Sequence, residues 1–305
     1  MTDTDSLQPD PTKIGEVSAP PFAVLPNPEA LFERREERLR LLSKGHTLAP
    51  YLTFVADVAH AQRGTLIGLP QVSTPIPEEL ARAREFQMPP IDRAGLPADP
   101  VFRQTLERFL DAAQAIDMPD ASRLALETLR AADTARRETL AHELSEPAAP
   151  YADLAQSVLV AAALQIHMAR LASKLDAAAL VSVGDGLCPV CGGRPCATMV
   201  VGWHGAHGSR FCACAMCGAL WNYVRIRCVA CGETKGISYK ALDDGDGAIK
   251  AECCAECGSY VKIFQQTQEP NIEPVADDIA SLGLDMRLRD ENFRRAGFNP
   301  FLLGY

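Results

Sequence analysis

Apolar residues in the first 180 positions recur at the three-to-four-residue spacing of an α-helix. Phe32, Leu39 and Leu42 belong to one such stripe, which begins at Pro28 and stops near Gly45. A stripe of this width is the face that a helix buries against a core. The pattern predicts helices over residues 28–45, 48–62, 78–85, 101–116, 121–132, 134–144 and 151–180.

The last of these helices is expected to lie at the centre of a helical domain. Its residues 158–164 are apolar all round, as in a helix that other helices surround. Cysteine is absent from the first 187 residues, which are rich in Ala, Leu, Arg and Glu. This part of the chain therefore predicts an all-α, bundle-like domain with a core of its own.

From residue 188 onward, short runs typical of β-strands replace the helical stripes. They fall into two sets of three, over 197–201, 209–213 and 219–227, and over 236–242, 248–252 and 259–265. Each set has a glycine-containing turn, at 202–208 or at 243–247, between its first two runs. This arrangement predicts two three-stranded ribbons.

The end of the chain predicts a helix over 282–291 and a docked tail. The last residues read Asn299-Pro-Phe-Leu-Leu-Gly-Tyr305. An apolar run at a terminus is unusual unless it is packed. Packing onto the chain's own helical domain is favoured over a tail that binds a partner.

All eleven cysteines lie in the second half of the chain, and eight of them form four Cys-x-x-Cys-Gly turns. Forty residues separate Cys188 from Cys228, and the same interval separates Cys217 from Cys257. A constant offset indicates a duplicated unit of two turns. The eight residues are Cys188, Cys191, Cys214, Cys217, Cys228, Cys231, Cys254 and Cys257.

The spacing within each turn is typical of metal binding. Two cysteines three positions apart can direct both sulfurs at one ion, and the following glycine permits a backbone conformation that strains other residues. Two such turns complete a tetrahedral site of four thiolates. A ribbon of about 35 residues buries too little apolar surface to fold alone, so the metal supplies much of its folding free energy. We therefore expect two tetrathiolate-bound metal ions.

The four turns can share two ions in two ways. Sequential pairing uses turns one and two for one ion, and turns three and four for the other. Interleaved pairing joins turns one and three, and turns two and four. The repeat favours sequential pairing, because a duplicated unit should carry a whole site. Cys196, Cys212 and Cys253 stand outside the pattern.

Disulfides are the competing interpretation of these cysteines. The first 21 residues are polar and lack the apolar stretch of a signal peptide, and no run reaches the length of a membrane span. These features predict a cytoplasmic protein without membrane insertion. In a reducing cytoplasm, clustered cysteines are more often metal ligands than disulfides. From the residues alone zinc is the favoured ion, although such turns also accept iron.

The segments expected from these patterns define an α+β fold. An all-α helical N-terminal domain precedes two tandem small β modules of the zinc-ribbon kind and a C-terminal helical tail. The expected boundaries are a disordered leader over 1–27, a helical domain over 28–183, metal ribbons over 184–226 and 227–266, and a C-terminal helix and tail over 267–305.

Charge and motif content weigh against two classes of function. The formal net charge is −9, which disfavours general nucleic-acid binding because that depends on neutralising phosphates. The sequence contains no phosphate loop, nucleophile elbow or dinucleotide fingerprint, and it shows no small-molecule substrate site. We therefore predict a protein that is not an enzyme.

Two other pairs of residues allow a functional and a structural interpretation. His204 and His207 lie near the first site and could be ligands, but exposed turn residues beside a full site are expected. Asp277 and Asp278 could be a catalytic carboxylate pair. A structural role at a helix start, where acids interact favourably with the dipole, is favoured.

Motifs outside the cysteine turns add a family resemblance. They are His46-Thr-Leu-Ala-Pro-Tyr-Leu52, Trp221 and Val224-Arg225 between the pairs of turns, Glu252-Cys-Cys-Ala-Glu-Cys-Gly-Ser-Tyr-Val-Lys262, Ala276-Asp-Asp-Ile-Ala280, Leu284-Asp285 and Asn299-Pro-Phe-Leu302. With these motifs the chain resembles the formate dehydrogenase accessory (FdhE-type) proteins over nearly all of its length except the leader. The spare cysteines and the turn 202–208 are not part of the family pattern.

The resemblance implies a cytoplasmic maturation factor for respiratory formate dehydrogenase. It implies contact with the catalytic, molybdenum-cofactor-bearing subunit before that subunit is exported by the twin-arginine route. It also implies rubredoxin-like metal modules, which favour iron over zinc. The main alternative is a rubredoxin-like electron-transfer protein that acts on the dehydrogenase cofactor. A zinc-ribbon nucleic-acid binder is a third possibility, which the charge disfavours.

Overall fold

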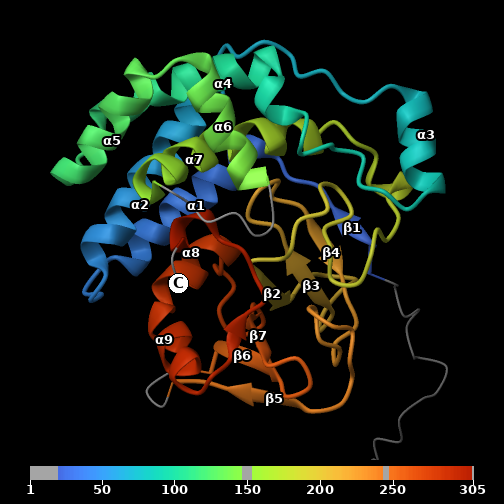
Figure 1. The fold of residues 1–305 in the computed structure, drawn as a ribbon. Coiled ribbons are helices and arrows are strands. Elements are labelled where there is room, and N and C mark those ends of the chain that lie inside the picture. The colour runs from blue at the N-terminus through green and yellow to red at the C-terminus, as the bar shows by residue number, and fades with distance from the viewer. Residues whose placement is uncertain (1–19, 146–152, 243–246, 304–305) are drawn as a thin grey trace, which may run out of the picture.

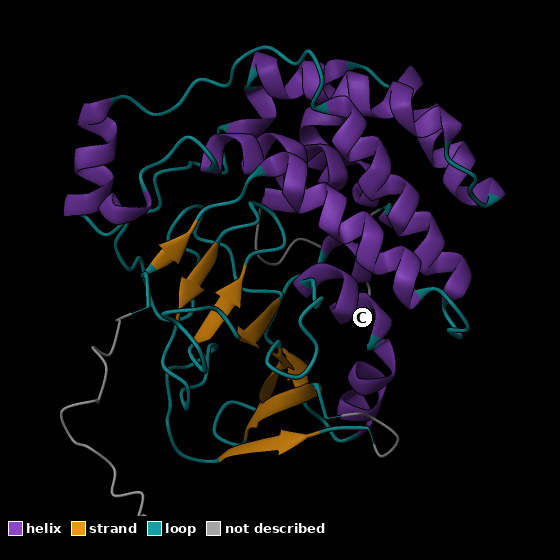
Figure 2. Cartoon of the chain, turned by 180° about the vertical axis from the view of Figure 1, so that it is seen from behind, coloured by secondary structure: helices purple, strands orange, loops and turns teal. Residues whose placement is uncertain are grey.

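Helices α1 to α7 form a layer above a sheet in the computed structural model, and two further helices lie beside that sheet (Figure 1). The structure describes residues 20–145, 153–242 and 247–303. Figure 2 shows the same arrangement from behind, with most of the helices above the strands and two short helices beside them. The α+β class predicted from the sequence is confirmed.

The helices of the first half match the predicted segments closely. Their bounds are α1 Pro28–Leu42, α2 Ala49–Thr65, α3 Pro77–Glu85, α4 Pro100–Ala112, α5 Asp120–Ala131, α6 Thr134–Ser145 and α7 Leu154–Ala172. Helix α1 begins where expected because the Asn27 side chain accepts a hydrogen bond from the Ala30 amide, and Pro28 occupies the first turn.

Helix α7 lies at the centre, as predicted, and contacts α1, α2, α4, α5 and α6. It is long and apolar enough to cross a membrane by length and composition, but 78% of that stretch is buried inside the fold. It ends at Ala172 rather than near residue 180. The Asp176 carboxylate accepts a hydrogen bond from the Ala178 amide and starts a separate 3-10 turn, Ala177–Ala179.

One buried histidine of α7 gives a testable pH dependence. His167 Nε2 lies 3.2 Å from an Asp99 carboxylate oxygen, and burial lowers the pKa of His167 more than Asp99 raises it. The unfolded chain therefore takes up a proton below a pH of about 6.5 that the folded chain does not. We expect the free energy of unfolding to fall as the pH drops below about 6.5. The His167→Gln variant should lack the part of this pH dependence that comes from His167. Equal pH slopes of thermal unfolding for the two proteins would contradict it.

The strands form one sheet in the order β1-β4-β3-β2-β7-β6-β5, with β8 beside β7. Their bounds are β1 Ala23–Val24, β2 Ala197–Val200, β3 Arg210–Ala213, β4 Leu220–Asn222, β5 Ile237–Lys240, β6 Ile249–Cys254, β7 Ser259–Gln265 and β8 Arg294–Arg295. Strands β2–β4 and β5–β7 are the two predicted antiparallel ribbons. They are joined by a parallel pairing of β2 with β7, which the sequence did not predict.

Strand β4 is shorter than the predicted run 219–227. The buried Arg210 guanidinium donates hydrogen bonds of 3.1–3.3 Å to the carbonyl oxygens of Val224, Arg225 and Arg227. These bonds hold the segment after β4 away from the sheet ladder. The predicted turn at 243–247 lies largely outside the described residues.

The chain before α1 differs from the expected disordered leader over residues 20–27. Strand β1 pairs with β4, with Ala23 opposite Trp221, and the Asn222 amide donates to the Phe22 carbonyl at 2.8 Å. The segment is ordered because it completes the open edge of the first ribbon. Residues 1–19 lie outside the described residues.

The C-terminal segment connects the sheet to the helices. It contains α8 Pro274–Ala280, α9 Leu282–Asp290, strand β8 and the 3-10 turn Pro300–Leu302. Phe301 and Leu302 are buried, and the Tyr51 hydroxyl donates to the Phe301 carbonyl. The prediction that this tail packs on the chain's own helical domain is confirmed for residues 299–303.

Asp277 and Asp278 have structural roles, as favoured from the sequence, but through buried ion pairs. Asp277 lies 2.7 Å from Arg38 of α1, and the two residues join the halves of the chain. Asp278 pairs with Lys262 and Arg295, and these bases also contact Asp285. Burial raises the pKa of Asp278, and the two bases outweigh that effect and hold it below its ordinary value.

The two halves share a core instead of having one each. A continuous set of buried side chains runs from Phe32 and Phe109 in the helices to Phe211 and Phe264 in the sheet. Contacts of α8 with both α1 and β2 close the gap between the halves. The expectation that the helical domain has a core of its own is therefore wrong.

Candidate metal centres

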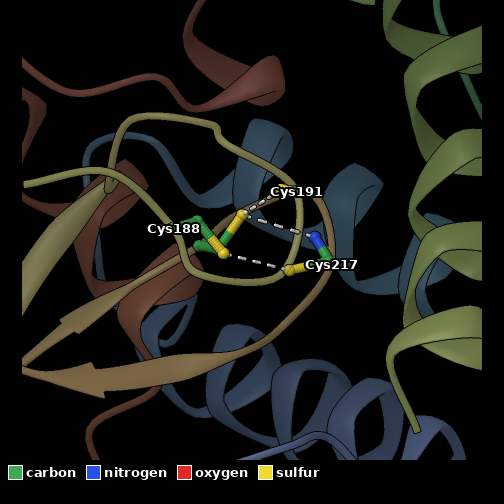
Figure 3. Close-up of side chains that lie close together, drawn as sticks. Cys188, Cys191 and Cys217 are labelled. Atoms are coloured by element: carbon green, nitrogen blue, oxygen red, sulfur yellow. Dashed lines mark hydrogen bonds between the residues drawn. The ribbon is translucent and has the colours of Figure 1, made fainter. Parts of the chain in front are cut away.

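The first cysteine group brings four sulfurs together inside the protein. Cys188, Cys191, Cys214 and Cys217 are all buried, and their Sγ atoms lie within 4.8 Å of one another. The distance is 3.6 Å from Cys188 to Cys217 and 3.6 Å from Cys191 to Cys214. Figure 3 shows Cys188, Cys191 and Cys217 with their sulfurs turned toward one another.

The second group repeats this arrangement with Cys228, Cys231, Cys254 and Cys257. Its sulfurs are 3.7 Å apart between Cys228 and Cys257, and 3.8 Å apart between Cys231 and Cys254. The structure therefore groups the turns sequentially, as the 40-residue repeat favoured. All eleven cysteines are free of disulfides.

Each turn owes its shape to the glycine that follows it. Gly192, Gly218, Gly232 and Gly258 have φ between 64° and 76°, a region that other residues adopt with strain. The Gly192 amide donates to the Cys188 carbonyl at 2.8 Å and closes the first turn. The other three glycines make the equivalent bond in their own turns.

The sulfur positions fit a tetrahedral metal ion. Four sulfurs about 2.3 Å from a central ion are about 3.8 Å from one another. This agrees with the 3.6–3.8 Å found for two sulfur pairs in each group, and all four sulfurs of a group lie within 4.8 Å of one another. Burial raises the pKa of Cys228 to about 12 and that of Cys188 well above its ordinary value, whereas hydrogen bonds with the neighbouring cysteines lower the pKa of Cys214. Four thiolates in such a place require the positive charge of a bound cation. The donor set accepts zinc or iron.

The helical half covers the first group. The Gln165 side chain of α7 donates to the carbonyl of Ala215, inside the second turn, at 2.7 Å. The Ile91 amide donates to the carbonyl of Val190, inside the first turn, at 3.1 Å. Both turns of this group are therefore fixed by the helical half.

The second group is open to solvent on one side. Cys231 is exposed and Cys257 is half-buried, whereas all four cysteines of the first group are buried. The contacts of this group come from neighbouring turns and from β8, whose Arg294 amide donates to the Gly258 carbonyl at 2.8 Å. The two chemically equivalent groups thus differ in access.

This difference predicts unequal loss of metal. A chelator should remove the ion of the second group first. Its rate of removal should be about tenfold higher if the protein must open locally, at a free-energy cost of roughly 1.4 kcal/mol, before the chelator reaches the first group. Release from zinc-loaded protein can be followed with a coloured chelator. Cys231→Ser should abolish the fast phase, and a single rate constant for both ions in the parent would contradict the prediction.

The histidines that could have been ligands lie elsewhere. His204 and His207 are in the turn between β2 and β3, whereas the cysteine turns lie at the opposite end of that hairpin, beside the pairing of Ala197 with Ala213. Among the described residues, the only groups of His, Cys, Asp or Glu with metal-ligand spacing are the two cysteine groups. Cys196, Cys212 and Cys253 are buried and belong to neither group.

Buried charged residues near the groups escaped the sequence analysis. Arg210 of β3 lies 3.0 Å from Glu252 of β6, and this fully buried pair connects the two ribbons. Burial raises the pKa of Glu252 more than Arg210 lowers it. Both residues stand in predicted β-strands, where a charged side chain ordinarily faces solvent. The only sequence signal of their burial is a charged residue within a mostly apolar run.

Family models match nearly all of the described chain. The models named "FdhE, N-terminal", "FdhE, central domain" and "FdhE, C-terminal domain" match residues 20–185, 187–225 and 226–302. A Rhizobium meliloti "Protein FdhE homolog" is 44% identical over 302 residues, which are 98% of each chain. A Salmonella arizonae "Protein FdhE" is 33% identical and covers 92% of this chain and 91% of its own.

A solved structure agrees with these relationships. The crystal structure of the FdhE protein from Pseudomonas aeruginosa superposes with a TM-score of 0.84 at 33% sequence identity. The match covers 93% of this chain and 99% of that one. The resemblance seen in the motifs is thus confirmed in sequence and in fold, and the chain belongs to the FdhE family.

Proposed function

We propose that this chain is a formate dehydrogenase formation factor that binds the catalytic subunit in the cytoplasm before export. The observation that carries the proposal is membership of the FdhE family over the full length, with the same fold as an FdhE crystal structure. The export step and the identity of the partner subunit come from the motif resemblance.

The cysteine groups support a role in shaping a recognition surface, and they do not favour catalysis on a substrate. Cys188, Cys191, Cys214 and Cys217 would hold one ion, and Cys228, Cys231, Cys254 and Cys257 the other. Four sulfur ligands fill a tetrahedral ion, whereas catalytic zinc sites keep a position for water or substrate. A bound ion supplies positive charge and a cross-link between turns. We place the partner contact where the ribbons meet the helical half, because binding sites often lie between such units.

We predict two metal ions per chain, each with four sulfur ligands and no nitrogen ligand from His204 or His207. Iron is the proposed ion, because of the rubredoxin-like character implied by the resemblance, and zinc is the alternative. Elemental analysis gives the stoichiometry and the identity, and X-ray absorption gives the ligands. One ion per chain, or three sulfurs with one nitrogen, would contradict the prediction.

A second candidate is electron transfer to the dehydrogenase cofactor. The exposure of Cys231 favours it, since an electron-transfer centre must approach its partner closely. Zinc-loaded protein separates the two functions because zinc has no redox chemistry. Zinc-loaded protein that still restores dehydrogenase activity supports a formation factor, and loss of restoration with zinc but not with iron supports electron transfer.

Deletion of the gene tests the proposed function in the cell. We expect formate dehydrogenase activity to be lost while the polypeptide of the catalytic subunit is still made. The parent gene should restore activity, and the Cys188→Ser gene should fail to restore it fully. Full activity in the deletion strain would refute the proposal.

A further inference from the structure

A cavity of about 390 Å³ lies where the helical half meets the sheet. Helix α1, strands β2 to β4 and the segment before α8 surround it, at the junction seen below α1 in Figure 1. Leu31, Met199, Leu220 and Ile272 give it apolar walls, and the half-buried Trp203 adds an aromatic surface. Cavities with apolar walls and a few polar groups are the usual form of a ligand site.

Three arginines of α1 line this cavity: Arg34, Arg35 and Arg38. Arg35 is 1% exposed, and its Nε and Nη2 donate to one oxygen of Glu273 at 3.2 and 3.0 Å. Its Nη1 is buried and has no partner among the described residues. A buried guanidinium nitrogen without an acceptor is unfavourable, and a ligand in the cavity would supply one.

The acids nearby are already engaged. The second oxygen of Glu273 accepts from the Ala276 amide at 2.8 Å. Asp277 accepts from Arg38 at 2.7 Å, and Glu269 lies 3.6 Å from the same guanidinium. These bonds neutralise Arg38 and one edge of Arg35.

The polar groups that line the cavity and have no described partner are mainly hydrogen-bond donors. Arg34 uses its Nε on the Ala30 carbonyl, and no described residue pairs with its two terminal nitrogens. Glu37 is the only acid among the lining residues without a described partner, and it is exposed. A ligand that matches the cavity therefore presents negatively charged acceptors to Arg34 and to Arg35 Nη1.

We propose that this cavity binds a carboxylate attached to an apolar group. The carboxylate accepts from Arg35 Nη1 and from the terminal nitrogens of Arg34, and the apolar group packs against Trp203 and Met199. A single negative charge suits the one guanidinium here whose terminal nitrogens have no described partner, that of Arg34, better than a doubly charged phosphate does. The source is a free organic acid or an acidic side chain of a polypeptide, which present the same chemistry. Binding here does not depend on an action on formate dehydrogenase.

The first test uses the full chain with 3-phenylpropionate and its neutral analogue 3-phenylpropionamide. Nuclear magnetic resonance of the tryptophan indole N–H reports binding, with the Trp203 signal assigned from a Trp203→Phe variant. We expect the acid to shift this signal saturably and the amide to bind at least about tenfold more weakly, as for loss of a charged hydrogen bond. Equal affinities of acid and amide, or no saturable shift with any carboxylate, would overturn the proposal.

Variants then assign the binding to the arginines. Arg34→Gln, at an exposed position, should weaken binding about tenfold without loss of fold. The double variant Arg35→Gln, Glu273→Gln removes both buried charges together and should abolish binding. Arg40→Gln, on the same helix but outside the cavity, is the matched control and should leave binding unchanged. Parent-like binding by both cavity variants would refute the assignment.

A peptide arm separates the two sources. N-acetyl-Phe-Asp-amide is compared with N-acetyl-Phe-Asn-amide, which differs only in the negative charge. Preference for the aspartate peptide over both phenylpropionate and the asparagine peptide supports the proposal and identifies a polypeptide as the source. Preference for phenylpropionate supports a free organic acid. The proposal would be overturned if the aspartate and asparagine peptides bound equally well and 3-phenylpropionate bound no better than its amide.

Discussion

Replacing Cys188 with serine is expected to lower the stability of the whole chain, and not that of the ribbons alone. Four-sulfur sites contribute roughly 10–16 kcal/mol of apparent binding free energy in small metal modules, and loss of one ligand removes a large part of it. The first group is buried, and Gln165 of α7 bonds directly to its second turn. Because the core is continuous from helices to sheet, the loss should spread to both halves.

Two spectroscopic signals distinguish global from local unfolding of Cys188→Ser. Far-ultraviolet circular dichroism reports mainly the helices, and fluorescence reports Trp203 and Trp221, the two tryptophans, which both belong to the first ribbon. We expect both transitions to move together to a lower temperature. Cys196→Ala, which changes a buried cysteine outside the groups, is the control and should have a much smaller effect. A fluorescence transition that moves alone would show that the halves unfold separately.

Breaking the buried ion pair between α1 and α8 is the second large expected effect. Arg38→Ala leaves the Asp277 carboxylate, with 0% of its side chain exposed, without its cation. Removal of one partner from a buried pair destabilises proteins by about 3–5 kcal/mol. Denaturant unfolding should therefore show a loss of this size.

Two controls define the origin of that loss. Arg103→Ala breaks a more exposed pair with Glu138 and should cost less than about 1 kcal/mol. The double variant Arg38→Met, Asp277→Leu removes both charges and should be much less destabilised than Arg38→Ala. Equal losses for Arg38→Ala and Arg103→Ala would contradict a structural role for the buried pair.

The sequence predicted the elements whose signals are local. The stripes of apolar residues located α1 to α6 to within a few residues, and the Cys-x-x-Cys-Gly repeat predicted which cysteines come together. Both depend on the positions of near neighbours, such as Cys188 and Cys191. A glycine after each turn and a proline at the start of α1 strengthened those predictions.

The features that were missed arise from contacts between distant parts of the chain. Strand β1 is two residues long and exists because Ala23 meets Trp221. The parallel pairing of β2 with β7 joins ribbons that look independent in the sequence. Arg38 occupies the buried face of α1 because Asp277 neutralises it there. The unequal exposure of the two cysteine groups depends on the helices that cover the first group. The 40-residue repeat could not predict it, because the two units have the same cysteine spacing.

Direct capture of the catalytic subunit tests the central claim. The tagged chain is purified from the cytoplasm of cells that make formate dehydrogenase, and bound polypeptides and bound metal are measured in the same sample. We predict that the catalytic subunit co-purifies with the parent chain, that each chain carries two metal ions, and that Cys188→Ser captures much less of the subunit. Capture of no catalytic subunit by a fully metal-loaded parent chain would contradict the account.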